Sequence, residues 1–514
     1  SLGCNIGSGL MVVTGKALYT GGPGNMVLAY TLLCTCVGAA LQTLAEMTVA
    51  FPVSGNFVNY AQRWLDPSLA FAAGFAEWLG WTAVSSAEAT VFTVIVNYWA
   101  KESVHEAVWL TVFMVFVVGL FLLPNRYFAY YEYFAGLLKI IGLTIVIIVS
   151  IVIIAGGGPT GRVHNGEYWR TLPIKGFSNC ALLALWAVGD QVFVGILAGE
   201  AETPRISMGR ATKLIPYRNA LLYMLSIVLC TLMVPMNDDR LFGGSGSAAS
   251  PFVVAMNDAG ISGVPDFFNV VIMVGIAGVA VESVYLSSRV LRSMAEQELI
   301  PRFLAGVDSR GRPRWSLAIT LAVATMLTYI NLSNTGAEVF TWLNSITSSS
   351  FFIVWGVISL TSWRFRAALK AQGDPLFNEL YAWRCWAWPF PTVWLFTCTV
   401  LLLVCCIYIG LVPIVSLPFS HQRTRLTGAG IVFPICVFIF PVHDWGNYSS
   451  RVYRGPQSHL PHQSTGPSNS RPQKRATYVD GGGNSAVRGV LRDAGVEAVL
   501  IVFSGLNQLL SRLY

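Results

Sequence analysis

GCNIGSGL, residues 3–10, is the stretch that decides the fold, because it places three glycines within seven residues of an otherwise apolar segment. Glycine lacks a Cβ and costs a helix roughly 1 kcal/mol relative to alanine. In hydrocarbon, an unwound backbone persists only where protein or a polar cavity satisfies its amides. The stretch therefore predicts a ligand site, where free N–H groups and a helix dipole hold an anion. Close helix packing through Gly3 and Gly7 is the alternative.

The composition around this stretch is that of a polytopic membrane protein. The chain has 514 residues, of which 54% are hydrophobic and 11% charged, and its mean hydropathy is +0.58. Soluble domains carry about 25% charged residues. The net charge of +7 does not indicate a nucleic-acid partner, because the basic residues cluster in the loops between apolar segments. We expect membrane lipid to surround these segments. We find no metal-ligand spacing, and we expect no metal and no cofactor.

Eleven apolar segments are long enough to be transmembrane helices, which need about 20 mostly apolar residues. Their approximate bounds are 1–18, 26–50, 69–99, 107–123, 131–155, 177–198, 215–235, 264–290, 317–332, 339–362 and 389–415. Residues 1–415 are thus the expected core. Since residue 1 is Ser, we expect an N-terminal tail to be missing.

The basic residues of the loops predict the orientation of these segments. Fifteen Lys and Arg side chains follow even-numbered segments, and only five fall in the opposite loops. The positive-inside rule therefore predicts that the N-terminus is cytoplasmic.

The pattern decays beyond the eleventh segment. Residues 416–443 are a degraded twelfth segment, which Pro434 and Pro441 interrupt. Residues 444–514 are rich in Ser, Gly, Pro, Gln and Arg, and we expect a disordered or aberrant tail. A shifted reading frame or a misread intron would produce such a loss of pattern.

Several motifs together resemble the yeast-type fungal amino-acid permeases of the amino acid–polyamine–organocation superfamily. The opening stretch is similar to that family's G-G-x-I-G-x-G-L, with Cys4 in place of a glycine. The other matching motifs are GKAL (15–18), EMTVAFPVSG (46–55), the Glu-Tyr-Phe run before Lys139, GEAETPR (199–205) and RFRAAL (364–369).

The resemblance implies an all-α broken-helix transporter fold with a 5+5 inverted repeat. Segments one and six would be unwound at mid-membrane, and the substrate would lie between the two breaks. The resemblance also implies that protons drive transport. It implies a multi-pass protein of the plasma membrane that is no enzyme.

A zwitterionic amino acid needs two complementary poles. The freed amides of Ile6, Gly7, Ser8 and Gly9 are the candidates for its carboxylate. Segment six is the candidate for the second pole. Its candidate residues are Trp186, Ala187, Val188, Gly189 and Asp190.

Segment six departs from the motif of the family, which reads F-S-F-G-G-T-E. The family's glutamate falls on Val192, and Asp190 replaces a glycine. Asp190 is either a binding residue or a structural acid, and an acid inside a membrane is costly enough to indicate function.

Lys139 is the candidate proton-coupling residue. It lies about eight residues inside the fifth segment, roughly 12 Å from its end. Snorkelling to the membrane surface is the alternative. The resemblance implies that a lysine here replaces a sodium ion and exchanges protons.

Two acids are candidate pathway or gate residues. Glu88 matches an acid in the family's third helix, and Glu46 lies toward the cytoplasmic end of segment two. Glu77 and Glu282 have no counterpart in the family that we can identify. For all four acids, an internal hydrogen bond or ion pair is the alternative role.

We therefore expect a secondary active transporter that imports amino acids by proton symport and alternating access. The first alternative is a permease for another amine, such as a polyamine, a choline-like compound or a γ-amino acid. The second is a non-transporting nutrient receptor or a non-functional product.

Overall fold

The computed structural model describes most of the chain up to residue 411. The described residues are 6–53, 55–100, 103–123, 125–170, 176–189, 195, 204–241, 250–308, 311–333, 336–378 and 382–411. They belong to one compact unit, Ser1–Arg454. The expected twelfth segment, 416–443, and the tail, 444–514, lie outside the described residues.

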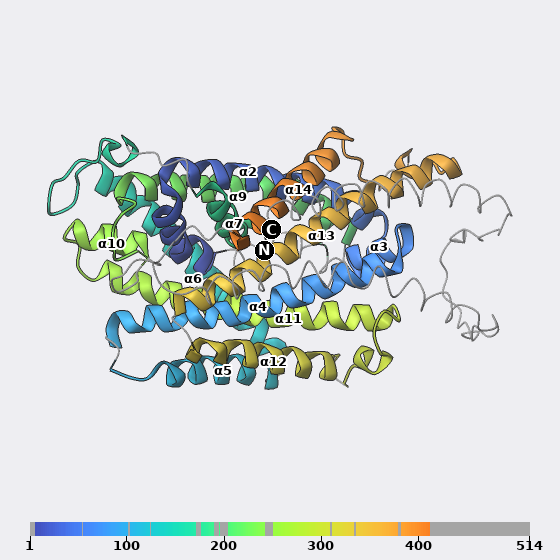
Figure 1. The fold of residues 1–514 in the computed structure, drawn as a ribbon, viewed down its shortest axis with the longest axis horizontal. Coiled ribbons are helices and arrows are strands. Elements are labelled where there is room, and N and C mark those ends of the chain that lie inside the picture. Colours follow the sequence, from blue (N-terminus) through green and yellow to red (C-terminus); the bar gives the residue numbers. More distant parts are fainter. Residues whose placement is uncertain are drawn as a thin grey trace. The chain divides into compact units, whose positions relative to one another are not determined.

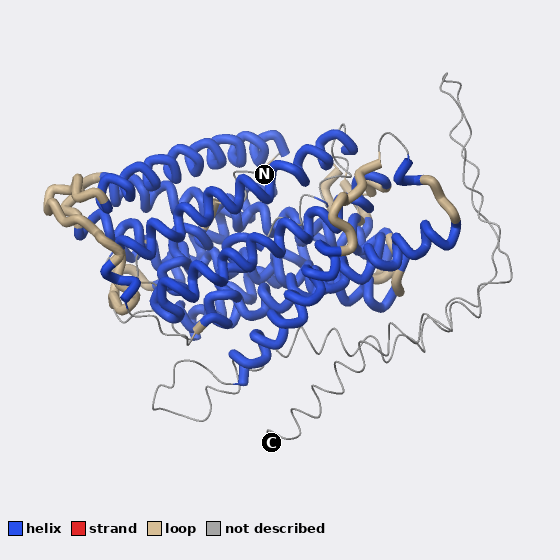
Figure 2. Tube along the Cα trace, turned by 90° about the horizontal axis from the view of Figure 1, so that it is seen from above, coloured by secondary structure: helices blue, strands red, loops and turns tan. Residues whose placement is uncertain are grey.

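Every regular element of the described part is a helix (Figures 1 and 2). A π-helical turn, η1 (Gly9–Val13), opens the fold. The α-helices are α2 (Thr14–Ala50), α3 (Asn56–Trp64), α4 (Pro67–Ala100), α5 (Glu106–Leu122), α6 (Asn125–Ile154), α7 (Phe177–Val188), α9 (Pro204–Met233), α10 (Pro251–Asp258), α11 (Val264–Glu296), α12 (Arg314–Tyr329), α13 (Gly336–Gln372) and α14 (Phe390–Leu411). The short 3₁₀ turns are η2 (Glu167–Arg170), η5 (Arg302–Ala305), η6 (Ile330–Ser333) and η7 (Leu376–Asn378).

Eight of the described helical spans are long and apolar enough to cross a membrane, and α5 and α7 are shorter apolar helices. This confirms an all-helical polytopic membrane protein. The number of eleven spans with a degraded twelfth, and the inverted repeat, stay predictions.

The first two expected segments are continuous in the structure. One helical span runs over Gly9–Ala50, and the turn between its two parts is at Gly22, where φ is 77° and ψ is 169°. Pro23 follows directly. A glycine is needed at this turn because its positive φ is unfavourable for other residues.

Two helices begin earlier than their hydropathy indicates. Helix α6 starts at Asn125 rather than near Tyr131, so Lys139 is the fifteenth of its 30 residues. Helix α9 starts at Pro204, so the charged stretch before residue 215 is helical rather than a loop.

Helix α4 is the centre of the described bundle. It packs most extensively against α11 and α13. In its most apolar stretch 89% of the residues are buried, compared with 33% in α6 and 28% in α12. Polar groups on α4 must therefore find partners within the protein.

Helices α2 and α7 approach each other closely at Gly21. A Cβ on Gly21 would lie 2.1 Å from the Cys180 sulfur, and one on Gly176 would lie 2.5 Å from the carbonyl oxygen of Thr20. The Cys180 thiol donates to the carbonyl oxygen of Ala17 at 3.2 Å. This seam has no room for an added methyl group.

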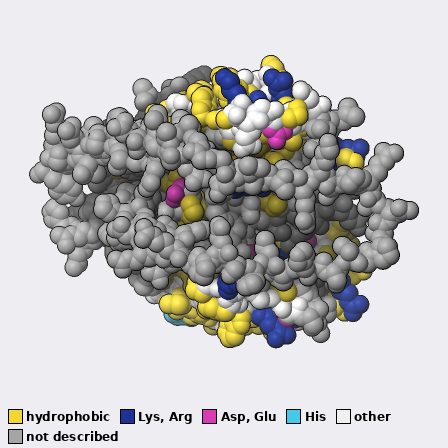
Figure 3. All heavy atoms as spheres, turned by 90° about the vertical axis from the view of Figure 1, so that its right-hand side faces the viewer, with side chains coloured by type: hydrophobic (Ala, Val, Ile, Leu, Met, Phe, Trp, Pro, Cys, Tyr) yellow, Lys and Arg dark blue, Asp and Glu magenta, His cyan; other side chains and the backbone are white. Residues whose placement is uncertain are grey.

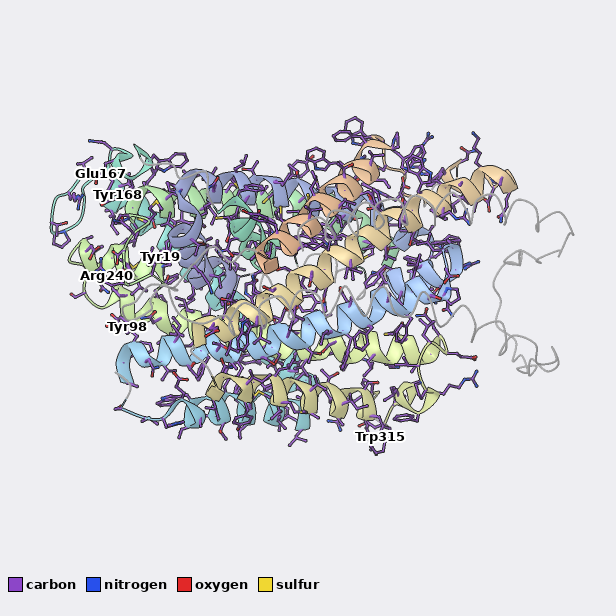
Figure 4. The ribbon with its side chains drawn as sticks, in the orientation of Figure 1. Tyr19, Tyr98, Glu167, Tyr168, Arg240 and Trp315 are labelled. Carbon is purple, nitrogen blue, oxygen red and sulfur yellow. The ribbon has the colours of Figure 1, made fainter. Side chains whose placement is uncertain are left out.

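The loops gather at two opposite ends of the bundle. Helix α3 and the C-terminal part of α13 lie at the right-hand end of Figure 1, and Trp315 lies toward the same end in Figure 4. Glu167, Tyr168 and Arg240 lie at the other end. On the right-hand face, Lys and Arg side chains occupy the upper and lower margins (Figure 3).

We predict that Gly176→Ala destabilises the protein strongly. Gly176 has φ +112° and its Cβ would meet backbone, so we expect a loss of about 3 kcal/mol. The measurement is the apparent melting temperature of the purified protein in detergent. Gly311→Ala is the matched control, because Gly311 also has a positive φ (+74°) but faces open space; its expected cost is about 1 kcal/mol. Equal losses in the two variants would contradict the proposed clash.

Candidate functional site

The glycine-rich stretch ends where the first helical turn begins. Ser8 caps η1 without a side-chain cap hydrogen bond, and the first described backbone bond of the turn runs from the Met11 N–H to the Gly7 carbonyl at 3.2 Å. The first amides of a helix have no intrahelical acceptor. Ile6 and Ser8 are nevertheless buried. The turn thus presents amide donors inside the bundle, with the positive end of its dipole.

The Ser8 hydroxyl joins this turn to two other helices. It donates to Glu88 Oε1 on α4 at 2.6 Å and accepts from the Trp186 indole N–H on α7 at 3.2 Å. Glu88 is 1% exposed, and its second oxygen, Oε2, has no hydrogen-bond partner among the described residues. A buried carboxylate oxygen of this kind is ready to accept a donor from a ligand.

The described part of segment six ends beside the first turn. Helix α7 stops at Val188, and the Gly189 N–H donates to the Leu185 carbonyl. A Cβ on Gly9 would lie 2.7 Å from Ala187 Cα, so the start of η1 and the end of α7 are in contact. The last carbonyls of a helix lack intrahelical donors. Asp190 lies outside the described residues.

A cavity lies between η1, α4, α7, α11 and α13. The cavity is small, with about 20 Å³ that the centre of a water-sized sphere can occupy. The residues that line it are Gly7, Gly9, Trp81, Val84, Glu88, Trp186, Ala187, Val279, Thr347 and Phe351. Five of these were candidates from the sequence, and Val188 and Gly189 are not among the lining residues.

The sequence analysis missed the other five lining residues. Trp81 and Val84 precede Glu88 by seven and four residues on α4, and helical spacing could have assigned them to the same face. Val279, Thr347 and Phe351 lie on α11 and α13. Only the packing of distant helices brings them to the cavity.

Glu77 holds the Trp81 side chain in position. The indole N–H of Trp81 donates to Glu77 Oε1 at 3.0 Å, and its ring packs against Phe351 with centroids 5.2 Å apart. Glu77 is 2% exposed. This acid therefore orients one aromatic wall of the cavity.

Lys16 supports the opposite wall. Its ammonium donates to Thr341 Oγ1 at 2.6 Å and lies 5.2 Å from the centroid of the Phe340 ring. The Phe340 ring meets Trp186 edge-on at 5.3 Å. The sequence analysis quoted Lys16 in a motif but gave it no role.

Lys139 is fully buried at the middle of α6, which argues against snorkelling. Two glycines of α11 face it. A Cβ on Gly275 would lie 3.7 Å from Lys139 Cε and 3.5 Å from the Ile6 carbonyl oxygen. The lysine side chain and the stretch before η1 therefore face the same glycine.

Glu46 lies away from the cavity, at the α13 C-terminal end of the bundle. It pairs with Arg366 through both oxygens, and Oε1 also accepts the Cys385 N–H at 2.8 Å. The Arg366 guanidinium also lies over the rings of Phe377 and Trp388 at 4.3 and 4.8 Å. These contacts tie α2 to α13 and to the segment before α14.

Comparison with known proteins supplies a family model that matches. The model described as "Amino acid permease" matches residues 1–448.

Individual relatives agree with the family model. An amino-acid permease of Candida albicans is 37% identical over 378 residues, which are 73% of this chain and 61% of that protein. The general amino-acid permease of Saccharomyces cerevisiae is 31% identical over 86% of this chain and 75% of its own length. The histidine permease of the same yeast is 32% identical over 72% and 64%. This chain therefore spans less than two thirds of some of these relatives.

We predict that Glu46→Gln destabilises the protein by about 3 kcal/mol, because it leaves the Arg366 charge unpaired in a site that is 13% exposed. The measurement is again the apparent melting temperature in detergent. Glu298→Gln is the matched control, because Glu298 and its partner Arg302 are 63% and 77% exposed; we expect a change below about 1 kcal/mol. Comparable losses of stability in the two variants would show that the Glu46–Arg366 pair contributes no more than an exposed ion pair.

Proposed function

Because this chain belongs to the amino acid permease family, we propose that it is a secondary active transporter that imports amino acids across the plasma membrane. Its family members are permeases, not enzymes. The observation that carries the proposal is the cavity in which backbone amides, a buried carboxylate and aromatic rings converge.

The groups around this cavity are complementary to the two poles of a zwitterion. The amides at Gly7, Ser8 and Gly9 receive the substrate carboxylate, since a helix N-terminus favours an anion. The free Oε2 of Glu88 receives the ammonium. The carbonyl of Ala187 supports the same pole.

Aromatic side chains enclose the rest of the substrate. Trp81, Trp186 and Phe351 line the cavity on different helices. The Trp186 indole N–H donates to Ser8 and joins the end of α7 to the start of η1. A movement of either segment would change this contact, and alternating access works by such movements.

Proton coupling is assigned to Lys139. Lys139 is a fully buried amine at the middle of a membrane helix, and an ionisable group in that position indicates a function. Its position beside Gly275 and the Ile6 carbonyl supports a link between its charge and the first broken segment. Substrate binding at Ser8 and Glu88 is thereby coupled to protonation.

The inner gate is assigned to the α13 C-terminal end, where Glu46 and Arg366 pair. The loops with most Lys and Arg gather at this end, so we assign it to the cytoplasm together with the N-terminus.

A permease for an amine without an α-carboxylate is the second candidate. The observation that favours it is that the carboxylate of Glu88 itself already accepts the Ser8 hydroxyl at the helix N-terminus. An ionised Glu88 would repel a second carboxylate there.

We predict that acid pH increases uptake of a radiolabelled mixture of the protein amino acids in a transport-deficient yeast strain. Lys139→Ala lowers this uptake at least about tenfold, because the proton-carrying group is lost. Surface expression is measured in parallel.

Lys370→Ala is the control, since Lys370 is an exposed lysine near the end of α13; it leaves uptake unchanged. Full uptake by Lys139→Ala would disprove proton coupling by this residue. If wild type at the surface takes up no amino acid but takes up a labelled polyamine, the second candidate is correct.

A further inference from the structure

Glu132 is a half-buried acid that the proposed function does not yet use. It lies seven residues before Lys139 on α6, so the two side chains share a face of the helix about two turns apart. Both of its carboxylate oxygens are shielded from solvent, and neither has a hydrogen-bond partner among the described residues. A carboxylate in this condition is costly, and inside a membrane it indicates a function.

Helix α11 makes room for Glu132 and Lys139 together at Gly278. A Cβ on Gly278 would lie 2.8 Å from Lys139 Nζ and 4.0 Å from Glu132 Oε2. Any larger residue would displace the ammonium. The amine and the carboxylate therefore both lie beside the same glycine.

Glu132 lies on the cytoplasmic side of Lys139 in the proposed orientation. Helix α6 starts at Asn125, and Glu132 is about 10 Å closer to that start than Lys139 is. The preceding helix, α5, is tied at this end by Arg312, whose guanidinium donates to the Phe121 carbonyl at 3.0 Å. The loops after even-numbered segments gather here.

Side chains near Glu132 connect α6 to α11 at this end. Phe128 stacks on Tyr285 with centroids 5.4 Å apart, and Arg289 donates to the Tyr285 hydroxyl at 3.2 Å. On the other side, a Cβ on Gly275 would lie 3.7 Å from Lys139 Cε and 3.8 Å from the Cα of Gly7, which lines the cavity. Lys139 thus stands between the substrate cavity and Glu132.

The helices that pack against α6 are α5, α9, α10 and α11. Their acidic, basic and tyrosine side chains are Glu106 on α5; Arg205, Arg210, Lys213, Tyr217, Arg218 and Tyr223 on α9; Asp258 on α10; and Asp266, Glu282, Tyr285, Arg289, Arg292 and Glu296 on α11. Helix α6 itself adds Tyr131, whose hydroxyl donates to the Val274 carbonyl at 3.2 Å.

We propose that Glu132 is the proton acceptor of Lys139 and carries the transported proton toward the cytoplasm. An N–H bond of the Lys139 ammonium breaks and an O–H bond forms on the Glu132 carboxylate, either after a side-chain rotation or through one water. Both groups are neutral after this transfer. Glu132 then releases the proton to cytoplasmic water and is ionised again.

This inference rests on the proposed proton coupling, and the test separates the two. Purified wild type and Glu132→Gln are reconstituted into liposomes, with the radiolabelled mixture of protein amino acids as the probe. Accumulation driven by a pH gradient is compared with exchange against the same mixture inside, which needs no net proton release. We expect Glu132→Gln to lose accumulation at least about tenfold while it keeps exchange within about twofold.

Three controls sharpen the result. Glu106→Gln, at an exposed acid of α5, keeps both activities. Glu132→Asp restores part of the accumulation, because a carboxylate is again present. Gly278→Ala, which displaces the Lys139 ammonium, repeats the loss of accumulation.

Two outcomes would overturn the inference. Gradient-driven accumulation by Glu132→Gln within about twofold of wild type would mean that another group accepts the proton. Loss of exchange together with accumulation would assign Glu132 a structural role. If wild type itself exchanges amino acids but shows no gradient-driven accumulation, the proposed proton coupling fails instead.

Discussion

A charged group surrounded by hydrocarbon needs a partner inside the protein, and this requirement fixes how the described helices meet. Glu88 is partnered by Ser8, which joins the central helix α4 to the start of η1. Glu46 is partnered by Arg366, which joins α2 to α13. Because water cannot substitute for these partners, each contact holds one relative position of two helices. If such a charged group exchanges one partner for another during transport, the helices that it joins must change their relative position. A change on one side of the membrane can then affect the other side.

The sequence predicted the existence and type of the helices well, because membrane spans carry long apolar runs. It misjudged where some of them begin. Helix α6 starts with Asn, Arg and several tyrosines, and α9 starts with a charged amphipathic stretch. Hydropathy excludes such residues from a span although their backbone continues the helix. With the correct start of α6, Lys139 lies at the middle of the helix and not in its outer part, and this changes the interpretation of the residue.

The sequence indicated candidate residues only where the signal is local in the chain. Glycines indicated the stretch that precedes η1, and its position as an acid in an apolar helix indicated Glu88. The rest of the cavity depends on contacts between residues far apart in sequence, such as Phe351 against Trp81. Glu132 was visible as part of a motif, but its significance depends on Gly278, on another helix. No spacing rule within one segment can provide that pairing.

The tight seam between α2 and α7 limits how this protein can diverge. A methyl group at position 21 would occupy the space of the Cys180 sulfur, and position 176 admits no side chain against Thr20. Position 21 can therefore enlarge only in a lineage where residue 180 has already become smaller. The seam behaves as a single inherited unit, and the order of its substitutions is constrained even though none of its residues lines the cavity.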